Sequence, residues 1–298
     1  MKNFTVSVVI PNFNGEKLLE KNLPVLLKAK ENSENRIGEI IIVDDGSVDG
    51  SAKLISSMFP SVKLIRHKKN RGFSASVNTG VRAAKEDLIC LLNSDVTPEN
   101  NFLEAVFPHF LKSKVFAVSL NETGEFGWAR GFFIDGFIGH STGSKPVTSH
   151  DTFWVSGGSG VFRRSVWMKL GGMDEKLLSP FYWEDVDLCY RALKRGYGLI
   201  WEPNAKVIHE HEATINRLSK RNVQKIFERN QLLFTWKNLT SANLLRKHIV
   251  GLFKRLAKHP GYLRIVVMAL GKIGVLIKSR NKETKEAKVS DEAIFSRF

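Results

Sequence analysis

The sequence predicts an α/β fold in which a mostly parallel central sheet is flanked by helices. Within the first 95 residues, four apolar strand-like runs alternate with segments of helical character, which is the pattern of parallel strands joined by crossover helices. The fourth run, Leu88–Leu92, is apolar throughout, as expected of a strand buried on both faces. Ligands of open α/β sheets bind at the carboxyl ends of the strands, so we expect the functional residues at that edge.

The elements of the first half follow from the apolar runs and the turn residues between them. In chain order they are a strand at Val6–Ile10, a helix over Leu18–Ala29, a strand at Ile40–Val43, a helix that ends at Met58, a strand at Val62–Ile65, a helix over Ser74–Ala84 and a strand at Leu88–Leu92. Asp49 or Ser51 is suited to cap the second helix, and Asn70-Arg71-Gly72 forms the turn before the third.

The second half begins less regularly. Residues 119–152 are rich in Gly, Thr and Ser with scattered aromatics, which indicates strands and loops without a readable pairing. The later elements are a strand-like segment at Phe153–Phe162, a helix over Ser165–Leu170 and a helix from Glu184 to Arg195-Gly196. Gly171-Gly172 ends the first of these helices, because glycine suits the left-handed C-terminal position.

The net charge of +15 is unevenly distributed. Residues 1–213 contain 26 Lys and Arg against 25 Asp and Glu, whereas residues 214–298 contain 19 against 5, so +14 of the total belongs to the last part. We therefore divide the chain into a nearly neutral domain, 1–213, and a basic extension, 214–298. We expect no nucleic-acid partner, because the extension has few aromatics for stacking and no recognisable nucleic-acid motif.

Several features favour a cytoplasmic location. Cys90 and Cys189 both lie among apolar residues, which favours buried thiols in a reducing compartment. The N-terminus runs directly into a strand without the apolar region of a signal peptide. The late apolar run Ile265–Ile277 contains Lys272 and falls short of the roughly 20 clean residues of a spanning helix.

Carboxylates suited to metal-assisted transfer chemistry occur at Asn93-Ser94-Asp95, after the fourth strand, and at Glu184-Asp185. They belong to five segments that occur in the order Ser7–Asn14, Ile42–Ser51, Asn70–Gly72, Leu91–Asp95 and Gly171–Arg191. Together these segments, over about residues 5–215, resemble the family 2 glycosyltransferases.

The resemblance implies a GT-A fold and the transfer of a sugar from a nucleotide-diphosphate sugar to an acceptor hydroxyl, with inversion. The Glu-Asp-Val-Asp-Leu-Cys form at 184–189 is similar to the non-processive, rhamnosyltransferase-like branch, and the Gln-x-x-Arg-Trp segment of processive synthases is missing. One sugar per encounter is therefore expected. The implied acceptor is a saccharide or lipid-linked saccharide in cell-surface polysaccharide or glycolipid assembly, received by residues 128–154 and the extension.

The resemblance also implies a divalent cation, Mg²⁺ or Mn²⁺. Asp95, the last member of the family's Asp-x-Asp motif, is the expected ligand, and Asn93 departs from that motif by one negative charge. The alternative for Asp95 is a strand-end residue that caps the following segment. His209 is the expected histidine ligand, with His211 as its competitor, and its second ring nitrogen needs an acceptor that the sequence does not identify.

The acceptor hydroxyl loses its proton as it attacks, which calls for a positioned carboxylate. The family uses the Asp of its Glu-Asp pair, which is Asp185 here, with Glu184 as the second candidate. The structural alternative for both is a helix N-cap.

Asp44 and Asp45 end the second strand, where the family recognises the base and ribose of the nucleotide, although Asp before Gly is also an ordinary turn former. The other residues expected to line the nucleotide-sugar pocket are Pro11, Asn14, Glu16, Asn70, Gly72, Asn93 and Ser94. Gly157-Gly158-Ser159-Gly160 either lets the backbone approach the sugars or forms a tight bend in a strand.

The extension contains a basic amphipathic helix. From Leu244, one side carries Leu245, Ile249, Leu252, Phe253 and Leu256, and the other carries Arg246, Lys247, Lys254 and Lys258. Such a helix suits an anionic membrane surface, here the cytoplasmic face. The alternative is a helix packed on the domain with a solvated basic face.

Two other functions compete with sugar transfer. A sugar nucleotidyltransferase should show a Gly-rich, Arg-containing phosphate loop after the first strand, where this chain has Pro11–Gly15. A non-catalytic nucleotide-sugar or membrane-binding module is favoured only if Asn93 abolishes metal binding.

Overall fold

The computed structural model describes residues 3–124, 127–210 and 219–298. The strands are β1 (Val6–Asn12), β2 (Ile37–Asp44), β3 (Lys63–Arg66), β4 (Leu88–Leu92), β5 (Val96–Pro98), β6 (Val115–Glu122), β7 (Ala129–Ile134), β8 (Phe137–Thr142), β9 (His150–Asp151), β10 (Ser159–Arg163) and β11 (Gly198–His209). The α-helices are α1 (Glu16–Glu31), α2 (Ser51–Met58), α3 (Phe73–Ala83), α4 (Phe107–Phe110), α5 (Arg164–Leu170), α6 (Glu184–Lys194), α7 (Lys220–Asn238), α8 (Ala242–Lys258), α9 (Leu263–Leu270), α10 (Ile273–Glu286) and α11 (Asp291–Phe295).

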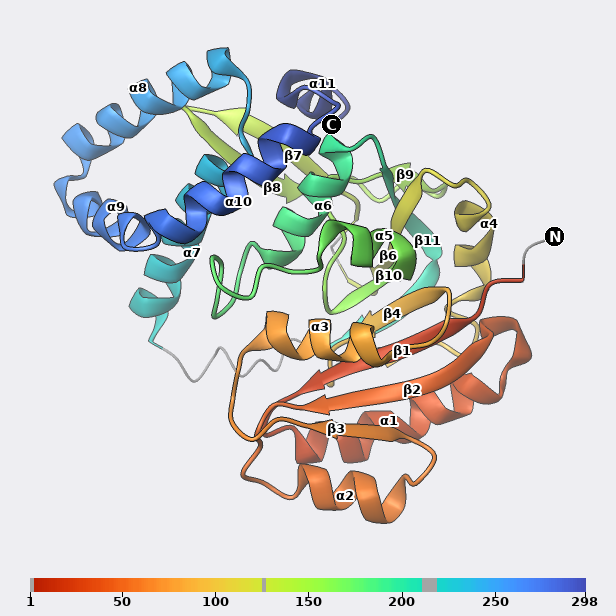
Figure 1. The fold of residues 1–298 in the computed structure, drawn as a ribbon. Coiled ribbons are helices and arrows are strands. Elements are labelled where there is room, and N and C mark those ends of the chain that lie inside the picture. Colours follow the sequence, from red (N-terminus) through yellow and green to blue (C-terminus); the bar gives the residue numbers. More distant parts are fainter. Residues whose placement is uncertain (1–2, 125–126, 211–218) are drawn as a thin grey trace.

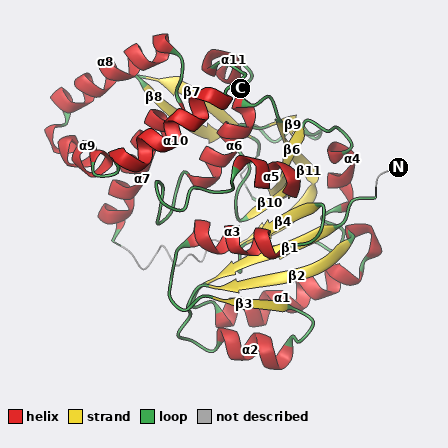
Figure 2. Cartoon of the chain, viewed as in Figure 1, coloured by secondary structure: helices red, strands yellow, loops and turns green. Residues whose placement is uncertain are grey.

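The central sheet has the strand order β3-β2-β1-β4-β10-β6-β11-β5, with β9 paired to β11. The strands from β3 to β4 are parallel, β10 is antiparallel to β4 and β6, and β6 is parallel to β11. Helices cover both faces of this sheet, as Figure 2 shows. The predicted α/β class with a large central sheet flanked by helices is confirmed.

The core lies in two layers because successive strand side chains point to opposite faces. Val8 packs in the layer that includes Leu23 of α1 and Ile55 of α2. Val9, the next residue, packs in the other layer, which includes Val77 of α3. This alternation explains why β4, which is buried on both faces, is apolar at every position.

One segment differs from the sequence-based expectation. The strand-like run from Phe153 contains a strand only from Ser159, because the residues around Gly157 form a turn instead of pairing. The described residues between 119 and 152 contain the strands and loops that the sequence predicts there: the end of β6, a separate hairpin of β7 and β8, and the short β9. The hairpin pairs Phe132 with Gly139 across its two strands.

The C-terminal helices lie beside α6 and the β7–β8 hairpin, away from β1–β3 (Figure 1). Phe234 of α7 and Ile294 of α11 belong to the same buried cluster as Tyr190 of α6. The predicted division between residues 213 and 214 lies outside the described residues. No single helix among those described is long and apolar enough to cross a bilayer, but the bent pair Pro260–Leu270 and Ile273–Glu286, kinked by 74°, meets that criterion when taken together.

Candidate active site

The end of β2 fixes the loop that follows β3. The buried Asp45 carboxylate accepts hydrogen bonds from the backbone N–H groups of Arg71 (2.9 Å) and Gly72 (2.8 Å). It also contacts Nδ1 of His67 at 2.6 Å. Gly72 adopts a φ of +89°, which favours glycine, and its N–H also contacts Oδ1 of Asn70 at 3.1 Å. The structure therefore brings three of the residues predicted to bind nucleotide to one place.

The end of β1 braces the next loop in a similar way. Oδ1 of Asn14 accepts the Val48 N–H at 2.9 Å, and Oε2 of Glu16 accepts the Gly50 N–H at 3.0 Å. Asp44 is fully buried and accepts a hydrogen bond from Asn12, the last residue of β1, at 3.2 Å. Pro11 lies in β1 opposite Val43 of β2 and is half-buried. These residues line one edge of the sheet and hold its loops in place.

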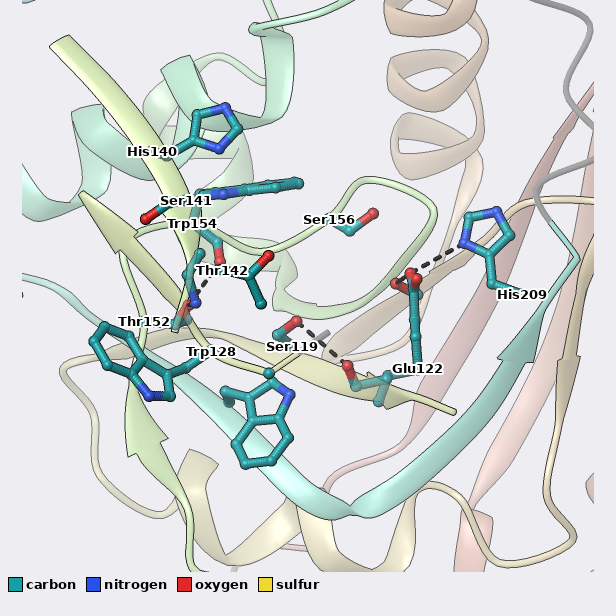
Figure 3. A pocket seen from close by; sticks show the side chains of 15 residues that line it. Ser119, Glu122, Trp128, His140, Ser141, Thr142, Thr152, Trp154, Ser156 and His209 are labelled. Carbon is teal, nitrogen blue, oxygen red and sulfur yellow. Dashed lines mark hydrogen bonds and ion pairs between the residues drawn. The ribbon is translucent and has the colours of Figure 1, made fainter. Parts of the chain in front are cut away.

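Asp95 and His209, which lie far apart in sequence, meet in the fold. Nε2 of His209 lies 3.2 Å from Oδ1 of Asp95, and Nδ1 of the same ring lies 3.1 Å from Oε1 of Glu122. Figure 3 shows the contact between His209 and Glu122. Burial lowers the pKa of His209, but the hydrogen bonds and charges of the two carboxylates outweigh it and raise the pKa to about 9. His211 lies outside the described residues.

The Asp95 and His209 side chains fit a divalent cation once the His209 ring has lost the proton that its pKa of about 9 retains at neutral pH. Two adjacent ligands of an octahedral ion at about 2.1 Å lie about 3 Å apart, which agrees with the 3.2 Å between Oδ1 and Nε2. Glu122 contacts the other ring nitrogen, where it would supply the acceptor that orients the ring of a metal-binding histidine. No group of three or more His, Cys, Asp or Glu among the described residues could hold an ion alone. Substrate phosphates would have to complete such a site.

Glu122 was missed in the sequence because it belongs to no recognisable motif. Its position depends on the pairing of β6 with β11, which places Glu122 opposite Val207, two residues before His209. The pairing of strands that are distant in the chain leaves no local pattern. The one feature of the sequence that could have identified Glu122 is its position as an acidic residue at the end of a strand-like run.

A glycine turn connects the end of β4 to the start of α6. The Asn93 N–H donates to the Gly158 carbonyl at 2.9 Å, and the Gly157 N–H donates to Oδ2 of Asp185 at 3.3 Å. A Cβ at Gly158 would lie 2.5 Å from Nδ2 of Asn93, so a larger residue at position 158 would force the Asn93 side chain to move. Ser94, next to Asn93, accepts the Asn22 side-chain N–H on its carbonyl at 2.8 Å.

The two carboxyl groups at the start of α6 have different environments. Burial, and then the charge of Asp185, raise the pKa of Glu184 well above its usual range, and Oε2 of Glu184 has no hydrogen-bond partner within the described structure. Burial also raises the pKa of Asp185, to about 6, although the N–H groups of Gly157 and Val186 oppose this shift. With a pKa of about 6, Asp185 is mostly ionised at neutral pH, whereas burial and the charge of Asp185 favour the protonated form of Glu184.

A cavity of about 440 Å³ is lined by Glu122 and His209, and by Ser156 next to the glycine turn, and is large enough for a sugar. Glu122 and His209 lie at one end of it, and His140 and Trp154 lie at the other (Figure 3). The indole N–H of Trp154 is buried without a hydrogen-bond partner in the described chain. The further aromatic and hydroxyl residues of the lining include Trp128, Trp201, Ser141, Thr142, Thr152 and Ser156. Flat aromatic faces with a few polar groups suit a saccharide.

The central sheet, with its strand-end aspartates, defines an α/β protein of the GT-A type. Residues 7–171 match the family described as glycosyl transferase family 2, and the chain belongs to that family. The pre-mycofactocin glycosyltransferase of Mycobacterium tuberculosis is 32% identical over 220 residues, which are 70% of this chain and 43% of that protein. This chain thus spans less than half the length of that relative.

Two further comparisons agree with the fold and the family. The N-acetylglucosaminyl-diphospho-decaprenol L-rhamnosyltransferase of Mycobacterium tuberculosis is 24% identical over 249 residues, or 69% of this chain and 76% of that protein. The mannosyltransferase of Pyrobaculum calidifontis, solved in complex with GDP-Man and Mn²⁺, has a TM-score of 0.58 at 15% identity and covers 96% of this chain and 86% of its own.

Proposed function

We propose that this protein transfers one sugar from a nucleotide-diphosphate sugar to an acceptor hydroxyl with inversion at the anomeric carbon. The observation that carries the proposal is the buried carboxyl group of Asp185, whose pKa burial raises to about 6 and which contacts the turn that also binds the end of β4. The acceptor oxygen forms a bond to the anomeric carbon as the bond to the diphosphate breaks. Asp185 accepts the hydroxyl proton on the face opposite the leaving group.

We place the nucleotide-sugar donor along the carboxyl edge of the sheet. In this proposal the nucleotide lies at the loops after β1, β2 and β3, which Asp44, Asp45, Asn14 and Glu16 hold in place. Asp95 and His209 would hold Mg²⁺ or Mn²⁺, which supplies positive charge to the leaving diphosphate. The similar mannosyltransferase, whose structure contains GDP-Man and Mn²⁺, supports this choice.

We place the acceptor saccharide in the 440 Å³ cavity, with its aromatic end around Trp128 and Trp154. The name of the rhamnosyltransferase relative, which acts on a diphospho-decaprenol-linked sugar, supports a lipid-linked saccharide and a role in cell-surface polysaccharide or glycolipid assembly. No feature of the described site favours nucleotidyl transfer.

The test is a panel of nucleotide sugars incubated with Mg²⁺, Mn²⁺ or chelator, with release of nucleoside diphosphate as the readout. We expect one donor to be consumed with metal, and little release with chelator or with Asp95→Ala. Pyrophosphate release from a nucleoside triphosphate and a sugar phosphate would instead indicate a nucleotidyltransferase. Donor binding without turnover, insensitive to chelator and to Asp95→Ala, would indicate a binding module.

Glu122→Gln should weaken Mn²⁺ affinity about 10- to 100-fold, because His209 loses the carboxylate that orients its ring. Isothermal titration with Mn²⁺ and nucleoside diphosphate measures this effect. Glu99→Gln is the matched control. Glu99 is exposed and its backbone N–H donates a hydrogen bond to Lys206 of β11, the strand that carries His209, so this variant should leave the Mn²⁺ affinity unchanged. Equal affinities for Glu122→Gln and wild type would contradict the orienting role.

A further inference from the structure

The outer edge formed by α8, α9 and the first half of α10 exposes an unusual amount of apolar surface. Ten of the eighteen large exposed hydrophobic side chains in the described chain lie between residues 249 and 277. They are Ile249, Val250, Phe253, Leu263, Val267, Met268, Leu270, Ile273, Val275 and Ile277. We call this set the apolar edge. Figure 1 shows α8 and α9 at the margin of the molecule, far from β3.

The apolar edge is not the face by which these helices pack on the protein. In α8 the buried positions are Leu244, His248 and Gly251, and Nδ1 of His248 contacts the Gly136 carbonyl at 2.6 Å. Phe253 points elsewhere and is 69% exposed. Exposed pairs four residues apart recur along the edge, at Ile249/Phe253, Leu263/Val267 and Ile273/Ile277, so each helix presents a stripe on one side.

The charge around these stripes is mostly positive, although Asp135 and Glu292 line a cavity together with basic residues of α8. Residues 229–282 contain twelve Lys and Arg and neither Asp nor Glu. Five of the twelve contact the protein itself: Arg229, Lys237, Arg255, Lys272 and Arg280. The other seven, all exposed, are Arg246, Lys247, Lys254, Lys258, Arg264, Lys278 and Lys282. An unbalanced positive charge therefore borders the apolar edge.

We propose that the apolar edge and its basic border dock the protein on an anionic lipid surface. Helices that lie in the interface insert an apolar side into the headgroup and acyl boundary while Lys and Arg contact acidic headgroups. Charge complementarity favours this occupant over a second copy of the chain, which would bring seven like charges against seven. The apolar stripes distinguish it from nucleic acid, which offers no apolar partner along its phosphates. This inference stands independently of sugar transfer.

The test is co-sedimentation of the full chain with vesicles of phosphatidylcholine alone or mixed with phosphatidylglycerol. We expect binding to the mixed vesicles that declines with salt. Lys247→Ala with Lys254→Ala should lower vesicle affinity about 25-fold, at about fivefold per charge. Phe253→Ser should lower it about tenfold or more. All three positions are exposed, so thermal unfolding should stay that of wild type.

Lys53→Ala and Met58→Ser on α2 are matched controls, exposed but remote from the apolar edge, and should bind like wild type. Equal binding to neutral and anionic vesicles, or equal losses in the α2 and α8 variants, would overturn the proposal. The proposal would also be overturned if the wild-type protein ran as a dimer in size-exclusion chromatography and Phe253→Ser ran as a monomer. The apolar edge would then be a contact between two copies of the chain.

Discussion

Asp185→Asn should lower kcat about 10²- to 10⁴-fold, because the amide has no basic lone pair to accept the proton of the acceptor hydroxyl. The substitution preserves the shape of the side chain, and its carbonyl oxygen can still accept one of the two N–H groups, of Gly157 and Val186, that the carboxylate accepts. Donor affinity, measured by titration with the nucleotide sugar, should therefore stay within a few-fold of wild type. The rate of transfer with saturating donor and acceptor is the measurement.

The pH dependence of kcat/KM shows whether Asp185 acts as a base or as an acid. A base must be ionised to act, and the pKa of Asp185 is raised to about 6. kcat/KM should therefore fall about tenfold per pH unit below 6 and reach a plateau above about 7. A rate that rises as pH falls would mean that the group acts as an acid.

Glu184→Gln is the matched comparison. Burial and the charge of Asp185 raise the pKa of Glu184 and so favour its protonated form, which the neutral amide resembles in size and charge. This variant should keep most of its activity, with a loss below about tenfold, far smaller than that of Asp185→Asn. The reverse order of losses would assign the base to Glu184.

The first half of the fold was predictable because its signals are local. Leu88–Leu92 is apolar and ends in a polar turn, and β4 has these same limits. The segment from Phe153 is a case in which local signals fail to predict the structure. Its residues suit a strand, but the contacts of Gly157 and Gly158 with Asp185 and Asn93 turn the chain before β10 begins.

Only those site residues that belong to sequence motifs were predictable. The sequence paired Asp95 with His209 through a family resemblance, and the structure places them 3.2 Å apart. Their roles as metal ligands stay predictions. Glu122 required knowledge that β6 pairs with β11, and this long-range pairing has no local signature.

The basic extension was predictable as helices but not in its contacts. The sequence placed Leu245, Ile249 and Phe253 on one apolar side, whereas the structure half-buries Leu245 and exposes the other two. From the sequence, Lys237 is only one of the many positive charges of the extension. In the fold it is buried and bonded to Asp174 and Asp187, each at 2.9 Å.

Asp187→Ala should destabilise the protein by about 3–5 kcal/mol, because it leaves two buried cations without their shared partner. The fully buried Asp187 carboxylate accepts hydrogen bonds from Arg191 (2.8 Å), Lys237 (2.9 Å) and Asn238 (2.7 Å). These contacts join α6, which begins at the candidate base, to α7. Thermal unfolding should shift down by about 10 °C.

The same group predicts an acid-sensitive stability. Burial raises the pKa of Asp187, but Lys237 and Arg191 outweigh it and lower the pKa to about 2. A carboxyl whose folded pKa lies below its unfolded value near 3.8 stabilises the fold above pH 4, by about 2 kcal/mol. That contribution is lost as pH falls from about 4 to 2, and Asp187→Ala should lack this part of the acid transition.

Asp151→Ala separates a buried network from an ordinary ion pair. Asp151 pairs with Arg297 at 2.6 Å, but both side chains are largely exposed, so its removal should cost at most about 1 kcal/mol. Equal unfolding temperatures for the Asp151 and Asp187 variants would show that the α6–α7 contact does not depend on the buried carboxylate. If Asp187→Ala alone is destabilised and also loses transfer activity, the extension stabilises the segment that positions Asp185.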